Sequence, residues 1–385
     1  MSDSAADRRG QQLGGRHRWG SWLQLLLPAL LFWSSVLEAA SEAPVLLYGT
    51  NLWGELEACG CMTDHLGGLT RRATVIKRER AVRPTLLVET GNTLLKTRLI
   101  PVGEEKVYLT QAERVLNQLR PLALDALLPG PFDLINYMPL LEASALPLVC
   151  ANLLRKHPGP SPWVAVRRVK LGPFSVALTG LLSPGTLLPE QYLVSSPQEA
   201  LNALPLGGPC DVVILLSGLS ADELDHLERP ANLAGIPILI VNATGERKLD
   251  VPLLHDGMFV LEAGTRGRYF GKLILRANAA QGLLTDRSQA VRLQQEVQFW
   301  REELDRYRRQ AIAEGVKDDW TEIGRFFARD PVAAVDLENL HRRVKDFEQL
   351  LTALPSPEGE GLINEVLPLS MGIPEDPAMR GETSR

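Results

Sequence analysis

The chain has 385 residues, of which 45% are hydrophobic and 23% charged, and this composition excludes a disordered or fibrous protein. Its length suits one large domain or two. The formal net charge is −5 and no basic stretch is interleaved with aromatic residues, which argues against a dedicated nucleic-acid binder.

The first forty residues are predicted to be a secretory signal peptide. Arginines at positions 8, 9, 16 and 18 form a basic region, which the apolar stretch 22–37 and several small residues around Ser41 follow. This apolar stretch is shorter than the roughly 20 residues that a membrane span needs, so cleavage is favoured over an uncleaved anchor. We assign 1–43 to the signal peptide and expect a periplasmic or secreted protein.

A short buried strand is predicted at Val45–Tyr48, where the residues are apolar. A loop is predicted after it, because the chain contains four glycines there, Gly54, Gly60, Gly67 and Gly68. The stretch 69–81 then has the spacing of an amphipathic helix. We expect Leu69, Ala73 and Ile76 to face inward, and Arg71, Arg72, Lys77 and Arg78 to face outward.

Further strands and helices alternate along the chain and predict an α/β domain over residues 44–280. Strands are expected at 85–91, 123–128, 146–153, 211–216 and 236–241, and helices at 108–120, 134–143, 196–204 and 221–228. The segments 164–169 and 175–182 are predicted to form a β-hairpin. The segments 258–262 and 269–276 are expected to be a final pair of strands.

Residues 281–354 have a different pattern, with charged and Gln-rich helices. A heptad seam runs through Ala290, Leu293, Val297, Trp300, Leu304 and Tyr307, and a second one through Leu337, Leu340, Val344, Phe347 and Leu351. These patterns predict an antiparallel, coiled-coil-like hairpin that folds on itself or associates with a second subunit through residues 285–351. Residues 355–385, which are rich in Pro, Gly and charge, are expected to be an irregular tail.

The four cysteines would meet an oxidising compartment after export. Cys150 and Cys210 lie in apolar runs, where a cysteine is usually a buried small hydrophobe. Cys59 and Cys61 differ, because they lie one residue apart in a glycine-rich loop.

The order of several segments resembles the bacterial 5′-nucleotidases, within the calcineurin-like metallophosphatases. The first blocks are Thr50-Asn51, Gly67-Gly68-Leu69-Thr70-Arg71-Arg72 and Leu87–Thr93, and later ones are Leu146–Asn152, Val176–Pro184, Asp211–Ser217 and Glu262–Leu273. The resemblance covers 44–277. It implies two facing sheets flanked by helices, with metals held at the strand ends.

The resemblance also implies two divalent metals that polarise a phosphoryl oxygen and supply a hydroxide. At the positions of that family's ligands, however, this sequence has Leu52, Trp53, Asn92, Gly130-Pro131-Phe132, Gly218 and Asn242 through Glu246. Asn51, Asn92 and Asn242 could offer neutral oxygens, but amides do not balance two divalent ions. We therefore predict that the dimetal site is lost, and divalent ions are expected only if the chain uses an unusual ligand set.

The segment Cys59-Gly60-Cys61 before Gly67-Gly68 resembles a subgroup of secreted relatives, the UshA-like (seleno)proteins. In some members of that subgroup selenocysteine takes a cysteine position, which implies redox chemistry at the motif. The first hypothesis is therefore thiol redox or soft-metal binding at Cys59 and Cys61. The alternative is that these cysteines are buried or bridged and carry no chemistry.

Residues near the two cysteines could assist such a site. His65 could be a base or a third ligand, and Arg71 and Arg72 near a helix start would favour a thiolate or an anionic substrate. Together with Gly67 and Gly68 they are the predicted binding residues. The partner would be an unidentified redox protein or a small anionic ligand.

Two other functions are kept open. The chain could be an active phosphoesterase with an unrecognised ligand set drawn from Glu55, Glu57, Asp64, Glu89 and Asp133, although each is expected to be a solvated surface charge. It could also be a non-catalytic scaffold whose helical hairpin binds partners.

Overall fold

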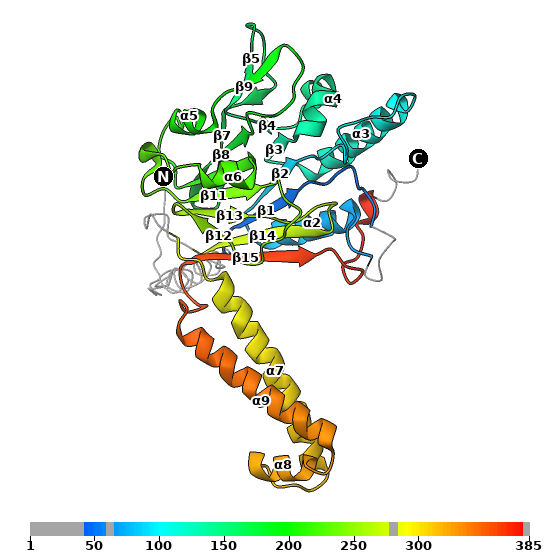
Figure 1. Cartoon of the computed structure of the whole chain (residues 1–385), viewed down its shortest axis with the longest axis vertical. Coiled ribbons are helices and arrows are strands. Elements are labelled where there is room, and N and C mark those ends of the chain that lie inside the picture. The colour runs from blue at the N-terminus through cyan, green and yellow to red at the C-terminus, as the bar shows by residue number, and fades with distance from the viewer. Residues whose placement is uncertain (1–41, 59–64, 277–283, 380–385) are drawn as a thin grey trace, which may run out of the picture. The chain divides into compact units, whose positions relative to one another are not determined.

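The computed structural model describes residues 42–58, 65–276 and 284–379, and two β-sheets that lie face to face organise them (Figure 1). The first sheet has the strand order β15-β14-β1-β2-β3-β4-β6. Its strands are β1 (Val45–Thr50), β2 (Thr85–Gly91), β3 (Ala126–Pro129), β4 (Leu148–Val149), β6 (Trp163–Val164), β14 (Tyr269–Arg276) and β15 (Gly361–Pro368).

The second sheet has the order β12-β13-β11-β10-β8-β7. Its strands are β7 (Val166–Leu171), β8 (Phe174–Leu182), β10 (Val212–Gly218), β11 (Ile238–Asn242), β12 (Leu253–His255) and β13 (Met258–Leu261). A separate small sheet pairs β5 (Leu153–Arg155) with β9 (Tyr192–Val194). The predicted hairpin is confirmed, because β7 and β8 pair antiparallel.

Side-chain alternation along β10 shows how the layers are built. Val212, Ile214 and Leu216 join the core between the two sheets, whereas Val213 and Leu215 join a second core on the outer face. A strand that is buried on both faces reads as a continuous apolar run, as parallel strands do. The helices α2 (Leu69–Val82), α3 (Glu105–Leu119) and α4 (Pro131–Glu142) pack against the main core, and α5 (Pro197–Asn202) and α6 (Ala221–Asp225) pack against the outer core.

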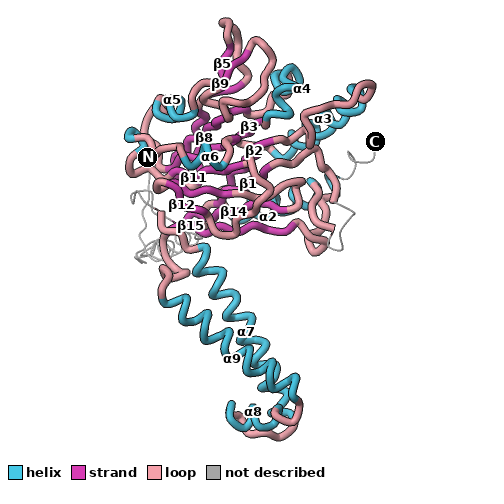
Figure 2. Tube along the Cα trace, in the orientation of Figure 1, coloured by secondary structure: helices cyan, strands magenta, loops and turns pink. Residues whose placement is uncertain are grey.

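The C-terminal helical element is α7 (Ser288–Ala313), α8 (Trp320–Phe327) and α9 (Pro331–Thr352). Figure 2 shows α7 and α9 side by side, and Arg301 pairs with Glu348 across them. Their shared core contains Leu304, Ala311, Leu337 and Leu340. The heptad patterns therefore predicted the packed faces of this hairpin.

Three expectations about the strands are wrong. The segments 258–261 and 269–276 do not pair, because β13 lies in the second sheet and β14 pairs with β1 and β15 in the first. The predicted strand 146–153 is divided into β4 and β5, which belong to different sheets. Residues 361–368, expected to be irregular, form β15 at the edge of the first sheet.

Across the described ranges, none of the helices combines the length and the apolar character that a bilayer span requires.

Candidate functional site

The carboxyl ends of parallel strands from both sheets meet at one edge. β1 and β2 are parallel and end together, with Thr50 opposite Thr90, and β10 and β11 end together in the second sheet. In open α/β sheets, ligands bind outside such strand ends. The positions where the resemblance places metal ligands lie at this edge.

Asn51 joins the two sheets at the edge. Its Oδ1 accepts from the backbone N–H of Asn92 at 3.0 Å, and its Nδ2 donates to the carbonyl oxygen of Ala243, at the end of β11. The backbone of Asn51 has a φ of 48°, which non-glycine residues adopt rarely. Both ends of this amide are therefore used within the protein.

Asn92 continues the network towards α4. Its Oδ1 accepts from the backbone N–H of Phe132 at 2.9 Å. A Cβ at Gly130 would lie 2.4 Å from this same oxygen, so glycine is required here by the close approach of the amide.

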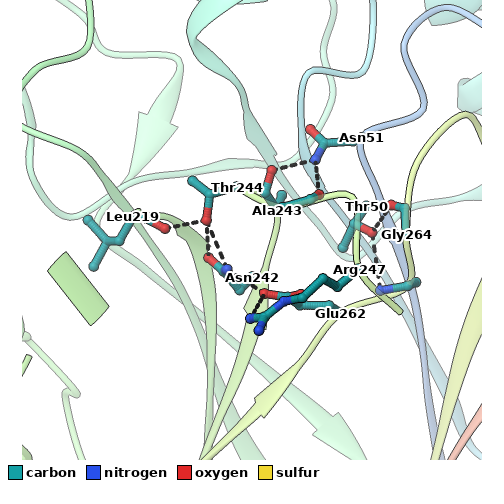
Figure 3. Close-up of polar contacts among 11 residues, drawn as sticks. Thr50, Asn51, Leu219, Asn242, Ala243, Thr244, Arg247, Glu262 and Gly264 are labelled. Atoms are coloured by element: carbon teal, nitrogen blue, oxygen red, sulfur yellow. Dashed lines mark hydrogen bonds and ion pairs between the residues drawn. The ribbon is translucent and has the colours of Figure 1, made fainter. Parts of the chain in front are cut away.

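A third cluster surrounds Asn242 (Figure 3). Its Nδ2 donates to Glu262 Oε1 at 2.8 Å and to Thr244 Oγ1 at 2.9 Å. Arg247 pairs with the buried Glu262 at 3.1 Å, and Thr50 Oγ1 donates to the carbonyl oxygen of Gly264 at 2.6 Å. The one carboxylate in this view is thus neutralised by an arginine.

The side chains at these positions do not fit as ligands of a pair of divalent metals. The side-chain oxygens of Asn51 and Asn92 accept from backbone N–H groups, and Gly130 and Gly218 offer no side chain. Divalent hydrolytic centres need anionic carboxylates or imidazoles to balance their charge. Within residues 42–58, 65–276 and 284–379, no group of three or more His, Cys, Asp or Glu side chains could hold a metal ion.

A small cleft of about 280 Å³ opens at this edge and has hydroxyl groups and one phenyl ring in its walls. Its lining includes Phe132, Ser183, Ser220, Glu223 and Thr244. Burial acts to raise the pKa of Glu223, but hydrogen bonds from Ser183 and Ser220 outweigh it and hold this pKa below its usual value. Glu223 also completes a capping box with Ser220, so it has a structural role in α6.

Cys59 and Cys61 lie outside the described residues. The described residues on either side of them lie close together, because Ala58 and Gly67 form an antiparallel bridge and Leu69 donates to the carbonyl oxygen of Leu56 at 2.9 Å. Gly68 precedes α2 with a φ of 102°, a conformation that favours glycine. His65 is exposed, and its predicted role stays a prediction.

The expectation that Arg71 and Arg72 face outward is wrong, because both are buried. Arg71 Nη1 donates to the carbonyl oxygens of His65, Gly67 and Leu369, at 3.2 Å for the last two. Its guanidinium therefore fastens the loop and the segment after β15 to the start of α2. These hydrogen bonds leave it poorly placed to attract an anionic substrate.

Arg72 forms an ion pair with Glu89 of β2, 2.6 Å between Nη1 and Oε2, and their side chains are 1% and 0% exposed. The guanidinium also lies 4.9 Å from the centre of the Phe270 ring. Burial raises the pKa of Glu89, although Arg72 acts to lower it. Among the described residues, Arg72 Nη2 and Glu89 Oε1 are buried without a hydrogen-bond partner, so the pair is only partly satisfied.

Asp133 is also fully buried, contrary to the expectation of a surface charge. It accepts from three successive backbone N–H groups, Thr93 at 2.7 Å, Leu94 at 3.1 Å and Leu95 at 3.0 Å. Burial raises its pKa to about 7 despite these donors. The carboxylate fixes the loop after β2 to α4.

The other candidate ligands and the remaining cysteines follow the expectations more closely. Glu57 is exposed and Glu55 is half-buried, while Asp64 lies outside the described residues. Burial raises the pKa of the Cys150 thiol to about 12 and also raises that of the half-buried Cys210. Neither thiol is therefore a good nucleophile at neutral pH.

No protein-family model matches this chain, and no curated protein matches it. Solved structures do. A 5′-nucleotidase precursor from Thermus thermophilus aligns with a TM-score of 0.51 and 17% identity over 63% of this chain and 53% of that one. The sulfate thiohydrolase SoxB of Thermus thermophilus, in complex with glycerol, aligns with a TM-score of 0.48 and 16% identity over 61% of this chain and 54% of that one. The calcineurin-like phosphoesterase YfkN of Bacillus subtilis aligns with a TM-score of 0.47 and 18% identity over 63% of this chain and 87% of that one.

The chain therefore has a metallophosphatase-like fold of the kind seen in 5′-nucleotidases. It spans about half the length of the 5′-nucleotidase precursor and of SoxB. At this identity the likeness establishes the fold alone, and any activity has to be argued from this chain's own residues.

The buried Arg72–Glu89 pair and Asp133 were missed by the sequence analysis, which placed them at the surface. One signal was present: Glu89 interrupts the apolar run Leu86–Val88 of a strand that is otherwise buried. A charge at such a position needs a partner, and α2 is the neighbouring element in the chain with arginines. Asp133 gave no comparable signal, because an aspartate in the first turn of a helix is common at the surface.

Proposed function

We propose that this chain is an exported, degenerate relative of the 5′-nucleotidases whose chemistry is carried by the thiols of Cys59 and Cys61 instead of a dimetal centre. The observation that supports it best is the amide network of Asn51 and Asn92, which occupies the strand ends with neutral, internally bonded groups. The UshA-like (seleno)protein subgroup, with its Cys-Gly-Cys-type motif, is the proposed affiliation.

The surroundings of the cysteine segment agree with this proposal. The bridge between Ala58 and Gly67 closes the base of the segment, and Arg71 binds the carbonyl oxygens on its C-terminal side. The residues that flank the cysteine segment are therefore held in place on both sides. Because the pKa of the Cys150 thiol is raised, this thiol does not compete with Cys59 and Cys61 as a nucleophile.

The proposed reaction is thiol–disulfide exchange. One thiolate attacks a disulfide of the partner and forms a mixed disulfide, and the second thiolate then displaces the partner. The pair ends as a disulfide, and the partner's disulfide becomes two thiols, so electrons and protons balance. A soft metal ion bound by the same two thiolates is the other use of the pair.

The test counts accessible thiols in the purified mature protein before and after mild reduction, together with its bound metals. We expect two thiols to appear reversibly in the wild type and to be absent from the Cys59→Ser/Cys61→Ser variant. Cys210→Ser is the matched control, because it removes a half-buried thiol elsewhere and should leave the reversible pair intact.

Two results would decide against the thiol proposal, and a third would choose between its two uses. Two stoichiometric metals together with unreactive thiols, and hydrolysis of p-nitrophenyl phosphate that is lost with a chelator, would restore the alternative of a metal-dependent phosphoesterase. Thiols that stay inert in both redox states would leave the cysteines structural. A soft metal that is lost in the double variant would favour the metal-binding use over exchange.

Export, domain organisation and association belong to the same proposal. We propose a signal peptide within 1–43, an α/β domain over 44–280, a helical region over 281–354 and a tail over 355–385. The intact mass of the exported protein tests whether the signal peptide is removed. Self-association through 285–351 is proposed as well, and a monomeric mature protein in sedimentation velocity would count against it.

A further inference from the structure

A second, larger cleft lies beside the loops that follow β1 and β2. It has a volume of about 700 Å³ and shares no lining residue with the small cleft at the strand ends. One wall is formed by α3 and the other by the two loops. Among its lining residues are Trp53, Leu94, Leu95, Lys96, Val107 and Tyr108.

The loop wall of this cleft is held firmly. The backbone N–H groups of Trp53 and Gly54 donate to the carbonyl oxygens of Asn92 and Thr93, each at 2.9 Å. Gln111 of α3 reaches across and donates from Nε2 to the carbonyl oxygen of Gly54 at 2.7 Å. Because Asp133 fixes residues 93–95 as well, both loops are fastened before any ligand arrives. A preformed wall spares a ligand the cost of ordering it.

Trp53 itself is held in an uncommon conformation. Its φ is 57°, which is rare for a bulky residue, and the guanidinium of Arg266 lies 5.5 Å from the centre of its ring. Strain of this kind persists where the surrounding structure fixes it, and such positions cluster at ligand sites. The strain places a large aromatic ring in the wall of a cleft.

The chemistry of the lining indicates the ligand. The rings of Trp53 and Tyr108 and the side chain of Val107, which is 66% exposed, supply apolar surface, while the buried Leu94 and Leu95 lie beneath it. The lining also contains three cations, Lys96, Lys106 and Arg114, and two carboxylates, Glu55 and Glu104. In the part of the chain that the structure describes, neither lysine takes part in an ion pair.

We propose that this cleft binds a small molecule with a flat apolar body and one anionic group. The two rings and Val107 would cover the body, and the two lysines would attract the charge. A metal ion does not suit the cleft, since its two carboxylates have no third ligand beside them in the described lining. The described lining of this cleft contains no cysteine, so the proposal does not depend on thiol chemistry.

The experiment uses 8-anilinonaphthalene-1-sulfonate as the probe, because it joins flat rings to a single sulfonate. Its fluorescence is titrated against the full mature chain and against Thr110→Trp, in which an exposed position of α3 in the cleft wall carries a bulky ring. Asn117→Trp is the matched control, since it places the same ring at an exposed position of α3 outside the lining. We expect Thr110→Trp to weaken binding about tenfold or more and Asn117→Trp to leave it unchanged.

A second pair of variants tests the charge. Lys96→Glu/Lys106→Glu should weaken binding of the probe about tenfold, whereas Lys317→Glu/Lys345→Glu, the same change on the helical element, should not. Equal binding by Thr110→Trp and Asn117→Trp would overturn the proposed location, because the probe would then occupy another apolar surface. Equal effects of the two lysine pairs would overturn the anionic group of the ligand.

Discussion

Two groups of buried polar residues lie along the neighbouring strands β1 and β2. One is the Arg72–Glu89 pair and the other is the amide pair Asn51 and Asn92, and their polar atoms find partners in different ways. Glu89, before the edge, is a buried carboxyl group that pairs with Arg72. Asn51 and Asn92, at the edge itself, are neutral and bond to the backbone. Glu262 is likewise buried and pairs with an arginine, Arg247.

This contrast bears on the proposal that the dimetal site is lost. A pair of divalent ions would be the partner for several carboxylates at the strand ends, so the fold alone does not forbid them. The neutral edge is a property of the particular residues in this chain. The two clusters can be separated by mutation.

The largest effect is expected from breaking the buried ion pair. Arg72→Ala or Glu89→Ala leaves one charge buried without its partner and should cost about 3–5 kcal/mol of the free energy of unfolding, measured by urea denaturation. The double variant Arg72→Met/Glu89→Leu should lose less than either single variant, because no buried charge remains.

The exposed pair Arg301–Glu348 of the helical element provides the control for this prediction. Its side chains are 57% and 43% exposed, so Arg301→Ala should cost about 1 kcal/mol or less. If Arg72→Ala and Arg301→Ala were equally mild, the Arg72–Glu89 pair would contribute no more than a surface contact, and the contrast with the amide edge would disappear.

A smaller effect on the free energy of unfolding is expected from Asp133, and this effect depends on pH. Its pKa is raised to about 7 in the folded protein, against about 4 in an unfolded chain. Between these values the folded state holds a proton that the unfolded state has released, so the free energy of unfolding should fall as the pH rises from about 4 to about 7.

The variant Asp133→Asn should flatten that dependence and lower stability by about 1–3 kcal/mol, because one of the three backbone N–H groups loses its acceptor. Stability curves from about pH 4 to about pH 8 measure both effects. Asp346→Asn, an exposed aspartate of α9, serves as the control and should leave the slope as in the wild type. A slope that persists in Asp133→Asn would show that another group titrates.

The smallest effect is expected at the amide edge. Asn51→Ala removes an acceptor for the N–H of Asn92 and a donor for the carbonyl oxygen of Ala243, which should cost about 1–2 kcal/mol. The melting temperature of Asn51→Ala is compared with that of Asn232→Ala, whose side chain makes an exposed hydrogen bond. Equal melting temperatures would mean that the edge is held by its backbone alone.

Much of the fold could be predicted from the sequence because it depends on neighbouring residues. The apolar runs that became β1, β2, β10 and β11 were found nearly at their observed bounds, and Leu69–Val82 forms the expected helix. The seams of α7 and α9 were found for the same reason, since a helix repeats its buried face every three or four residues. The residue types at Trp53, Asn92 and Gly218, from which we predict the loss of the dimetal site, can also be read directly from the sequence.

The tertiary structure alone decided which of these segments are partners. Arg72 and Glu89 are 17 residues apart and Tyr48 bonds to Asn364 across 316 residues, separations that no local pattern reports. For the same reason β15 was taken for a tail, β13 and β14 were taken for a pair, and Asp133 was taken for a surface charge. Spacing along a chain determines which side of an element is apolar, whereas the burial of a charge depends on what packs against it.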